Sequence, residues 1–199
     1  MIMTQTEIRA LAASNQAKAH QVLDESGIVT LLEKTGCRVN IIGSLRMQLL
    51  VTHNDIDLHI YSSGITVESS FAIMAQIAAD QRVSEVRCIN GLHTEERCLA
   101  WHINYNSPAN GKWKFDIIHI EEGSLYDGYF EKMAERIVHV MTPEQRDTIL
   151  RLKFEAPDDS DYHGVEFYEA VIADGVSDMD AFQTWVSSHR KRPPYYWIP

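Results

Sequence analysis

The sequence of 199 residues is poor in cysteine, and its three cysteines form no Cys-x-x-Cys pair. Such a set argues against a zinc site or a disulfide scaffold and fits a reducing compartment. The sequence also contains no apolar run of bilayer length, so we expect no transmembrane helix and no membrane partner. Its first 19 residues are too polar for a signal peptide, which together with the free thiols predicts a cytoplasmic protein.

An excess of positive charge is also lacking, because the formal net charge is −10. An acidic surface disfavours nucleic acid as a default partner, since the phosphate backbone is recognised mainly by lysine and arginine. The sequence shows no internal repeat and no low-complexity segment. With 45% hydrophobic residues, the chain is long enough for one core with a smaller attached lobe.

Up to about residue 123 the sequence alternates between helical and strand patterns. The capping pair Thr4 and Glu7 starts the first helix, and Pro108 with Asn110-Gly111 predicts a tight turn that joins the last two strands as a hairpin. We expect helices over residues 4–25, 28–34 and 67–80, a short helix or turn over 45–51, and strands over 37–42, 55–61, 84–89, 97–105 and 113–120.

After Gly123 the pattern is helical throughout. Thr142 with Pro143 and Gln145 is a strong helix start, because threonine caps the helix and proline suits its first position. We expect helices over residues 126–140, 142–154, 165–173 and 178–188. The sequence therefore predicts an α+β fold with an α/β lobe over residues 1–123 and a helical lobe over residues 124–199.

Two carboxylates, Asp55 and Asp57, stand at alternate positions of one apolar strand. Side chains alternate along a strand, so both carboxylates point to the same face of the sheet. Two like charges side by side are costly to bury unless a cation neutralises them. A third carboxylate, Asp116, lies in its own apolar strand, and together the three form a plausible set of oxygen ligands for Mg²⁺.

The pair Gly43-Ser44 follows a predicted strand and precedes a short helix or turn. Backbone N–H groups and a hydroxyl at such a position suit a triphosphate. Taken singly, each aspartate would be an exposed or ion-paired strand residue. Taken together with Gly43-Ser44, the three carboxylates favour a metal site.

These motifs resemble the DNA polymerase β-like nucleotidyltransferase superfamily. Its signature is an apolar residue with Gly-Ser or Gly-Gly, about ten residues, an Asp-apolar-Asp strand, and a later single aspartate on another strand. Ile42-Gly43-Ser44, Asp55-Ile56-Asp57 and Asp116 match these parts in order, over about residues 37–120. The resemblance implies a nucleotidyltransferase-like mixed sheet with helices on one face, followed by a variable helical domain.

The resemblance also implies a role for each matching residue. Gly43 and Ser44 match the pair that contacts phosphate, and we add Arg46 as the nearby cation. Asp55 and Asp57 match the carboxylates that bind two Mg²⁺ ions. Asp116 matches the third carboxylate, which helps to hold the catalytic metal and can deprotonate the acceptor hydroxyl. The implied reaction moves a nucleoside monophosphate from a nucleoside triphosphate such as ATP to this hydroxyl, and pyrophosphate leaves.

The sequence departs from the family at Met47-Gln48, where many small members carry an Arg-Gly or Lys-Gly turn near the phosphates. This departure leaves a second interpretation open, in which the domain is catalytically weak or inactive and binds nucleotide or a partner protein. For an active enzyme, we expect a small-molecule acceptor rather than a protein side chain or an RNA end, and the net charge disfavours RNA. The oligomeric state stays open, and so does the role of the basic and aromatic tail, residues 189–199.

Overall fold

The computed structural model describes residues 3–157, 159–189 and 197–199. Its first 123 residues contain all five strands of the described chain and four of its helices. The strands are β1 (Arg38–Ile41), β2 (Asp55–Ser62), β3 (Val83–Gly91), β4 (Cys98–Ser107) and β5 (Gly111–Glu121). The helices are α1 (Gln5–Ser26), α2 (Ile28–Lys34), α3 (Gly43–Arg46) and α4 (Val67–Ala78).

The strands form one mixed sheet in the order β1-β2-β5-β4-β3. Only β2 and β5 run parallel, and the other neighbours are antiparallel. The hairpin of β4 and β5 confirms the turn predicted between them, and its register pairs Ser107 with Gly111. The mixed α+β fold predicted from the sequence is therefore confirmed.

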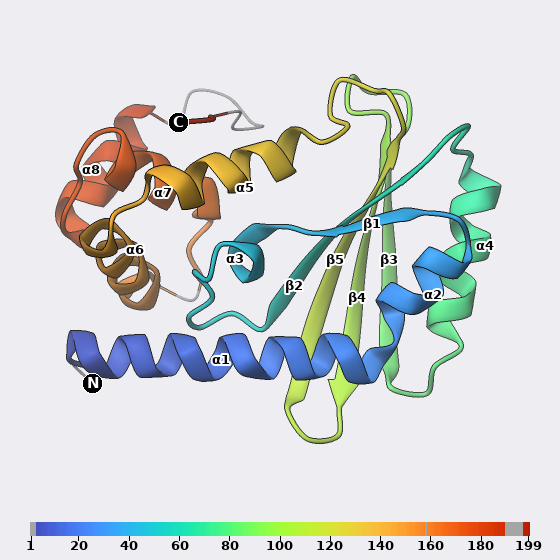
Figure 1. Cartoon of the computed structure of the whole chain (residues 1–199), viewed down its shortest axis with the longest axis horizontal. Helices are drawn as coiled ribbons and strands as arrows, with labels where there is room; N and C mark the ends of the chain where they lie inside the picture. Colours follow the sequence, from blue (N-terminus) through green and yellow to red (C-terminus); the bar gives the residue numbers. More distant parts are fainter. Residues whose placement is uncertain (1–2, 158, 190–196) are drawn as a thin grey trace.

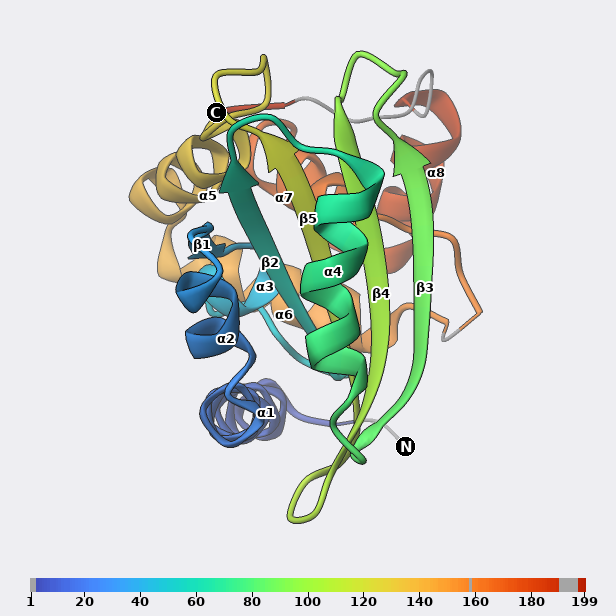
Figure 2. The same ribbon diagram turned by 90° about the vertical axis from the view of Figure 1, so that its right-hand side faces the viewer.

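One face of the sheet is covered by helices, and this face holds the first hydrophobic core (Figures 1 and 2). The second half of α1 packs there together with α2 and α4, through residues such as Val22, Leu32 and Met74. From the sheet, alternate residues such as Ile56 and Phe115 point into this core. The opposite face of β2 and β5 therefore carries Asp55, Asp57 and Asp116, as strand alternation predicts.

The chain after residue 123 forms four helices, seen beside the sheet in Figure 1. They are α5 (Tyr129–Val140), α6 (Pro143–Glu155), α7 (Gly164–Ile172) and α8 (Met179–His189). The expected cap of α6 is present, because the hydroxyl of Thr142 accepts from Gln145 N at 3.2 Å. The largest differences from the predicted boundaries lie in two helices. Helix α5 begins at Tyr129 rather than at residue 126, and α3 spans Gly43–Arg46 rather than residues 45–51.

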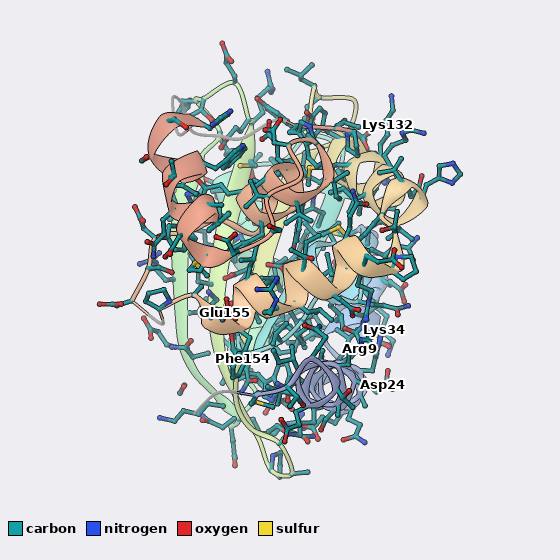
Figure 3. All side chains as sticks on the ribbon, turned by 90° about the vertical axis from the view of Figure 1, so that its left-hand side faces the viewer. Arg9, Asp24, Lys34, Lys132, Phe154 and Glu155 are labelled. Carbon is teal, nitrogen blue, oxygen red and sulfur yellow. The ribbon has the colours of Figure 1, made fainter. Side chains whose placement is uncertain are left out.

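Helix α1 runs along both lobes (Figure 1) and is seen end-on in Figure 3. Its first half, with Ile8 and Ala12, belongs to the hydrophobic core of the helical lobe. The guanidinium of Arg9 pairs with the carboxylate of Asp147 on α6. We keep the proposed division of the chain at residue 123, with α1 shared between the two cores.

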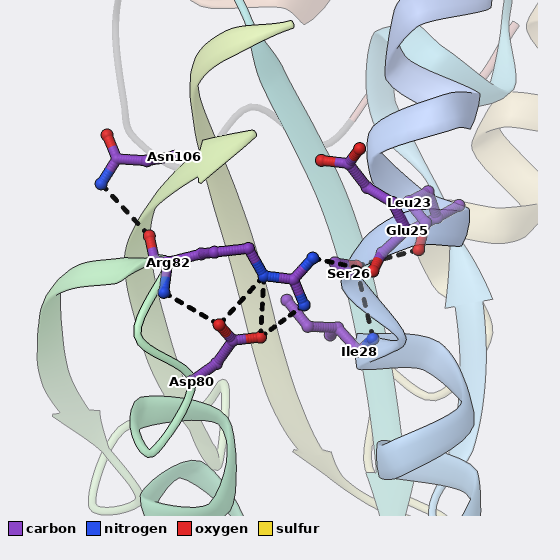
Figure 4. A network of polar contacts seen from close by, with 7 residues as sticks. All are labelled: Leu23, Glu25, Ser26, Ile28, Asp80, Arg82 and Asn106. Atoms are coloured by element: carbon purple, nitrogen blue, oxygen red, sulfur yellow. Dashed lines mark hydrogen bonds and ion pairs between the residues drawn. The ribbon is translucent and has the colours of Figure 1, made fainter. Parts of the chain in front are cut away.

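The far end of α1 is fixed to the sheet by Arg82, which precedes β3 (Figure 4). Its guanidinium donates to the carboxylate of Asp80 at 2.6 and 3.0 Å and to the carbonyl of Glu25 at 3.1 Å. The side-chain amide of Asn106 donates to the Arg82 carbonyl at 3.2 Å. These contacts join α1, the end of α4 and the β3–β4 pair, so the sheet and α1 hold a fixed relative position.

Candidate active site

The three predicted carboxylates lie at the junction of β2 and β5. These strands are parallel neighbours, and their register places Asp57 directly opposite Asp116 and Asp55 opposite Lys114. Since directly paired residues point to the same face, Asp57 and Asp116 are adjacent on the open face of the sheet. The sequence shows that each strand carries carboxylates, whereas the adjacency follows from the crossover that brings β5 beside β2.

The Gly43 backbone lies against Asp57. Ile42 N donates to the Asp57 carbonyl at 3.0 Å, which brings the start of α3 to the first half of β2. Gly43 has a φ of +65°, and a Cβ added there would lie 2.0 Å from Asp57 Oδ2. Only glycine therefore fits this position, because any side chain would displace the Asp57 carboxylate.

Ser44 is held from the helical lobe by two residues that the sequence analysis did not identify. Lys153 on α6 donates to Ser44 Oγ at 2.7 Å and to the Leu49 carbonyl at 2.8 Å. Tyr168 on α7 places its hydroxyl 3.1 Å from Ser44 Oγ. A lysine on a polar helix and a tyrosine on an apolar one carry no local signal of function. Both come to Ser44 only because α6 and α7 fold back over the sheet.

The structure does not bring Arg46 to the carboxylates. Its side chain is exposed and lines a separate hollow of about 560 Å³ together with Asn40, Glu131 and Glu135. The cation beside Ser44 is Lys153 instead. The backbone after Arg46 has the form that a glycine would favour, since Gln48 has a φ of +59°. The departure Met47-Gln48 therefore keeps a left-handed turn at the position of the family's glycine, at a strain of about 1 kcal/mol.

His102 on β4 is a third residue that the sequence analysis missed. Its Nδ1 lies 2.5 Å from Asp116 Oδ1, and the register of β4 and β5 places the two residues opposite each other. The sequence contains the information that pairs His102 with Asp116. The predicted turn at Ser107 to Gly111 fixes the register of the hairpin, and counting back from it pairs residue 102 with residue 116.

The carboxylates repel one another, and this repulsion contributes to a raised pKa of Asp57. Burial and then the neighbouring charges of Asp116 and Asp55 together raise the pKa of Asp57 to about 7, against the opposing effect of Lys153 and Lys114. Lys114 forms ion pairs with Asp116 Oδ2 at 3.0 Å and with Asp55 Oδ1 at 3.7 Å. Asp57 forms no ion pair within the described residues.

The Mg²⁺ ions that the sequence resemblance implies need oxygen ligands that share one position. In the part of the chain that the structure describes, no group of three His, Cys, Asp or Glu side chains surrounds one metal position. The donor set itself is suitable, because three carboxylates from adjacent strands offer the hard oxygen ligands that Mg²⁺ prefers. An ammonium group, Lys114 Nζ, already lies between Asp55 and Asp116. The carboxylates therefore fit a cation, and their side chains must turn away from Lys114 to share one.

A cavity of about 510 Å³ opens between this face of the sheet and the helical lobe. Its walls carry the three aspartates, Gly43 and Ser44 on the sheet side, and Lys153, Phe167 and Tyr168 on the helical side. The predicted residues other than Arg46 therefore line one cavity of a size that accepts a small ligand.

The described residues contain no helix that is both long and apolar enough to span a bilayer.

Two of the comparisons with known proteins found nothing: no family model and no curated protein matches this sequence. The fold, in contrast, matches many solved structures. The structure of the non-canonical poly(A) polymerase complex GLD-2–GLD-3 is similar with a TM-score of 0.62 at 11% identity, over 96% of this chain and 65% of that one.

Two further structures show the same likeness. The Cid1 poly(U) polymerase with MgGTP bound has a TM-score of 0.51 at 12% identity, over 70% of this chain and 42% of that one. The polymerase core of TRAMP, an RNA surveillance complex, has a TM-score of 0.51 at 13% identity, over 88% and 59%. This chain thus spans less than two thirds of each of these proteins. The likeness confirms the resemblance seen in the sequence at the level of fold: the chain has the fold of the polymerase β-like nucleotidyltransferases.

Proposed function

We propose that this protein is a nucleotidyltransferase that moves a nucleoside monophosphate from a nucleoside triphosphate to a hydroxyl group of an acceptor. One observation carries the proposal: Asp57 and Asp116 stand opposite each other on adjacent parallel strands, with the Gly43 backbone against Asp57. A plain structural domain has no need to keep carboxylates side by side on the wall of a cavity.

The triphosphate would bind at Gly43 and Ser44. Lys153 supplies the positive charge there, and it now donates to a hydroxyl and a carbonyl rather than to a carboxylate. An ammonium group with neutral partners can turn to phosphate oxygens without breaking an ion pair. We therefore assign the phosphate contacts to Ser44 and Lys153 and leave Arg46, on the far side of α3, outside the nucleotide site.

The acceptor hydroxyl would approach Asp116. This carboxylate is partly exposed, at 20% of its side-chain surface, so an incoming hydroxyl can reach it. His102 holds Asp116 Oδ1 in place at 2.5 Å. Asp116 would accept the proton of the hydroxyl as its oxygen attacks the α-phosphate and pyrophosphate leaves. Positioning of the two reactants in one cavity supplies a large part of the rate.

Asp55, Asp57 and Asp116 are the residues that would hold Mg²⁺, in one or two ions. When bound, Mg²⁺ neutralises the phosphate charge and stabilises the attacking and leaving oxygens. The raised pKa of Asp57 agrees with this assignment, because a carboxylate placed among like charges is most easily ionised beside a cation. The reaction would take place in the cytoplasm, as the free cysteines suggest.

The acceptor expected from the net charge was a small molecule rather than RNA. The similar structures do not support that preference, since they are those of poly(A) and poly(U) polymerases. Net charge describes the whole surface, whereas the carboxylate face itself carries Lys114 and is flanked by Lys112. An RNA 3′ end therefore stands beside a small polyol as an acceptor to test.

The test is a transfer assay with each nucleoside triphosphate labelled on the α-phosphate, with and without Mg²⁺. The acceptors are a short RNA, the same RNA with a 3′-deoxy end, and a panel of amino sugars. We expect labelled product and pyrophosphate with one acceptor class, and a loss of at least about a hundredfold in Asp57→Asn. Nucleotide binding without any pyrophosphate release would instead establish the inactive, nucleotide-binding module.

A further inference from the structure

Lys114 occupies an unusual place for a strand lysine. Its ammonium lies 3.0 Å from Asp116 Oδ2 and 3.7 Å from Asp55 Oδ1, within the set of carboxylates that would hold a metal. The position is built into the sheet, because Lys114 is paired directly with Asp55 across β2 and β5. A freely moving surface lysine would have no such fixed neighbour.

Lys114 is also the only lysine or arginine among the described residues that forms an ion pair with these carboxylates. Lys153 is committed to Ser44 and Leu49, and His102 contacts only the far oxygen of Asp116. Two of the three carboxylates, Asp55 and Asp116, thus share the Lys114 ammonium. The side chain of Lys114 is partly buried, with 38% of its surface exposed, so solvent screens this charge less than it screens an ordinary surface lysine.

A second cavity beside Lys114 can receive its ammonium group. Lys114 and Asp55 line not only the catalytic cavity but also a neighbouring cavity of about 300 Å³. The walls of this second cavity include three amide side chains, Asn54, Asn104 and Asn106, beside Lys112 and the aromatic Tyr105 and Trp113. Amide oxygens there can accept from an ammonium group, so Lys114 can leave the carboxylates without entering an apolar environment.

We propose that Lys114 is an internal counter-ion, which neutralises the carboxylates in the metal-free protein and is displaced when a divalent cation binds. The inference rests on the proposed function, because the displacing cation is the one that would accompany the triphosphate. It explains why the described residues form no ready metal site while three suitable ligands stand together. Lys114 stabilises the empty site and lowers its affinity for the metal.

The test measures binding of Mn²⁺ alone, by its electron paramagnetic resonance signal, without nucleotide or acceptor. We expect Lys114→Met to bind Mn²⁺ at least about fivefold more tightly than the wild type, because a competing positive charge is gone. The matched control is Lys34→Met, which removes an exposed lysine on α2 that lines neither of the two cavities. Its Mn²⁺ affinity should stay within about twofold of the wild type.

Thermal unfolding provides a second measurement. Without metal, Lys114→Met should melt below the wild type, and saturating Mn²⁺ should raise its melting temperature by more than it raises that of the wild type. Should Lys114→Met not fold, Lys114→Gln, which removes the charge and keeps a donor, takes its place. Equal or weaker Mn²⁺ binding in the variant, or no binding to either protein, would overturn the inference. Since no transfer is measured, a failure of the proposed reaction leaves this result unaffected.

Discussion

Gly43 is the residue at which the backbone comes closest to a candidate metal ligand. Two separate features require glycine at this position: its positive φ of +65° and its contact with Asp57. Gly64 also has a positive φ, of +67°, but a Cβ added to it would meet no atom within 4 Å. Substitutions of these two glycines therefore distinguish the effect of backbone strain, which both would show, from the effect of a displaced carboxylate, which only Gly43 would show.

We predict that Gly43→Ala lowers nucleotidyl transfer by at least about a hundredfold, because the new Cβ displaces the Asp57 carboxylate. It should also cost about 1–3 kcal/mol of stability from overpacking and strain. Gly64→Ala should cost about 1 kcal/mol from strain alone and leave transfer unchanged. Transfer rates and chemical denaturation of both variants measure this, and equal activities would show that the contact does not matter.

Asp57 should make stability depend on pH in an unusual direction. Its pKa is raised from 3.8 to about 7, first by burial and then by Asp116 and Asp55. The folded protein therefore binds more protons than the unfolded chain between these two values, and this contribution to stability is lost as pH rises towards 7.

We predict that the melting temperature of the metal-free wild type falls between pH 5 and about pH 7.5 relative to that of Asp57→Asn. The variant carries no titrating group at this position, so the difference between the two curves isolates Asp57. Calorimetry across this range measures it. Curves that run parallel throughout would contradict the raised pKa of Asp57.

At the scale of elements, α6 is important because it places the positive charge of Lys153 beside the sheet. Lys153 reaches both Ser44 on α3 and the carbonyl of Leu49 just beyond it. Phe154, which follows it, is a partly buried member of the helical core (labelled in Figure 3). The packing of α6 thus fixes where the Lys153 ammonium lies.

We predict that Lys153→Met weakens nucleoside triphosphate binding by about tenfold or more, because it removes a charge-assisted contact to phosphate. Lys132→Met is the matched control, since Lys132 is exposed on α5 (Figure 3). Calorimetric titration with a non-hydrolysable triphosphate measures both. Equal affinities in the two variants would place the phosphates away from Ser44.

At the scale of the whole molecule, α1 couples the two cores. Its first half packs against α6 and belongs to the core of the helical lobe, and its second half packs under the sheet. Ile8 in the first half is 1% exposed, and Val22 in the second is fully buried. A helix that belongs to both cores cannot leave one of them without disturbing the other.

We predict that Ile8→Ala costs about 2–5 kcal/mol and lowers amide protection in β2 and β5 as well as in α6. Val22→Ala, made in the other core, should lower protection in the same two places by a smaller amount. Hydrogen exchange followed by mass spectrometry resolves these segments. Loss of protection confined to the helical lobe would show that the two lobes unfold independently.

The sequence by itself determined the elements and the chemistry they carry. Strand alternation placed Asp55 and Asp57 on one face, and capping residues such as Thr4 and Thr142 marked where helices begin. These features are local, since they depend on side-chain period and on the backbone preferences of a few neighbouring residues. The order Gly-Ser, Asp-x-Asp and later Asp was equally visible, and the fold that it implied was confirmed.

Only the tertiary structure decided which residues of distant segments meet, because no short turn fixes their register as it does for His102 and Asp116. The crossover that makes β5 the parallel neighbour of β2 set Asp116 beside Asp57, and the return of α6 set Lys153 on Ser44. It also turned Arg46 away from the cavity, although Arg46 is two residues from Ser44. Contacts between segments far apart in the chain depend on how the helical lobe packs against the sheet, and no local pattern encodes that packing.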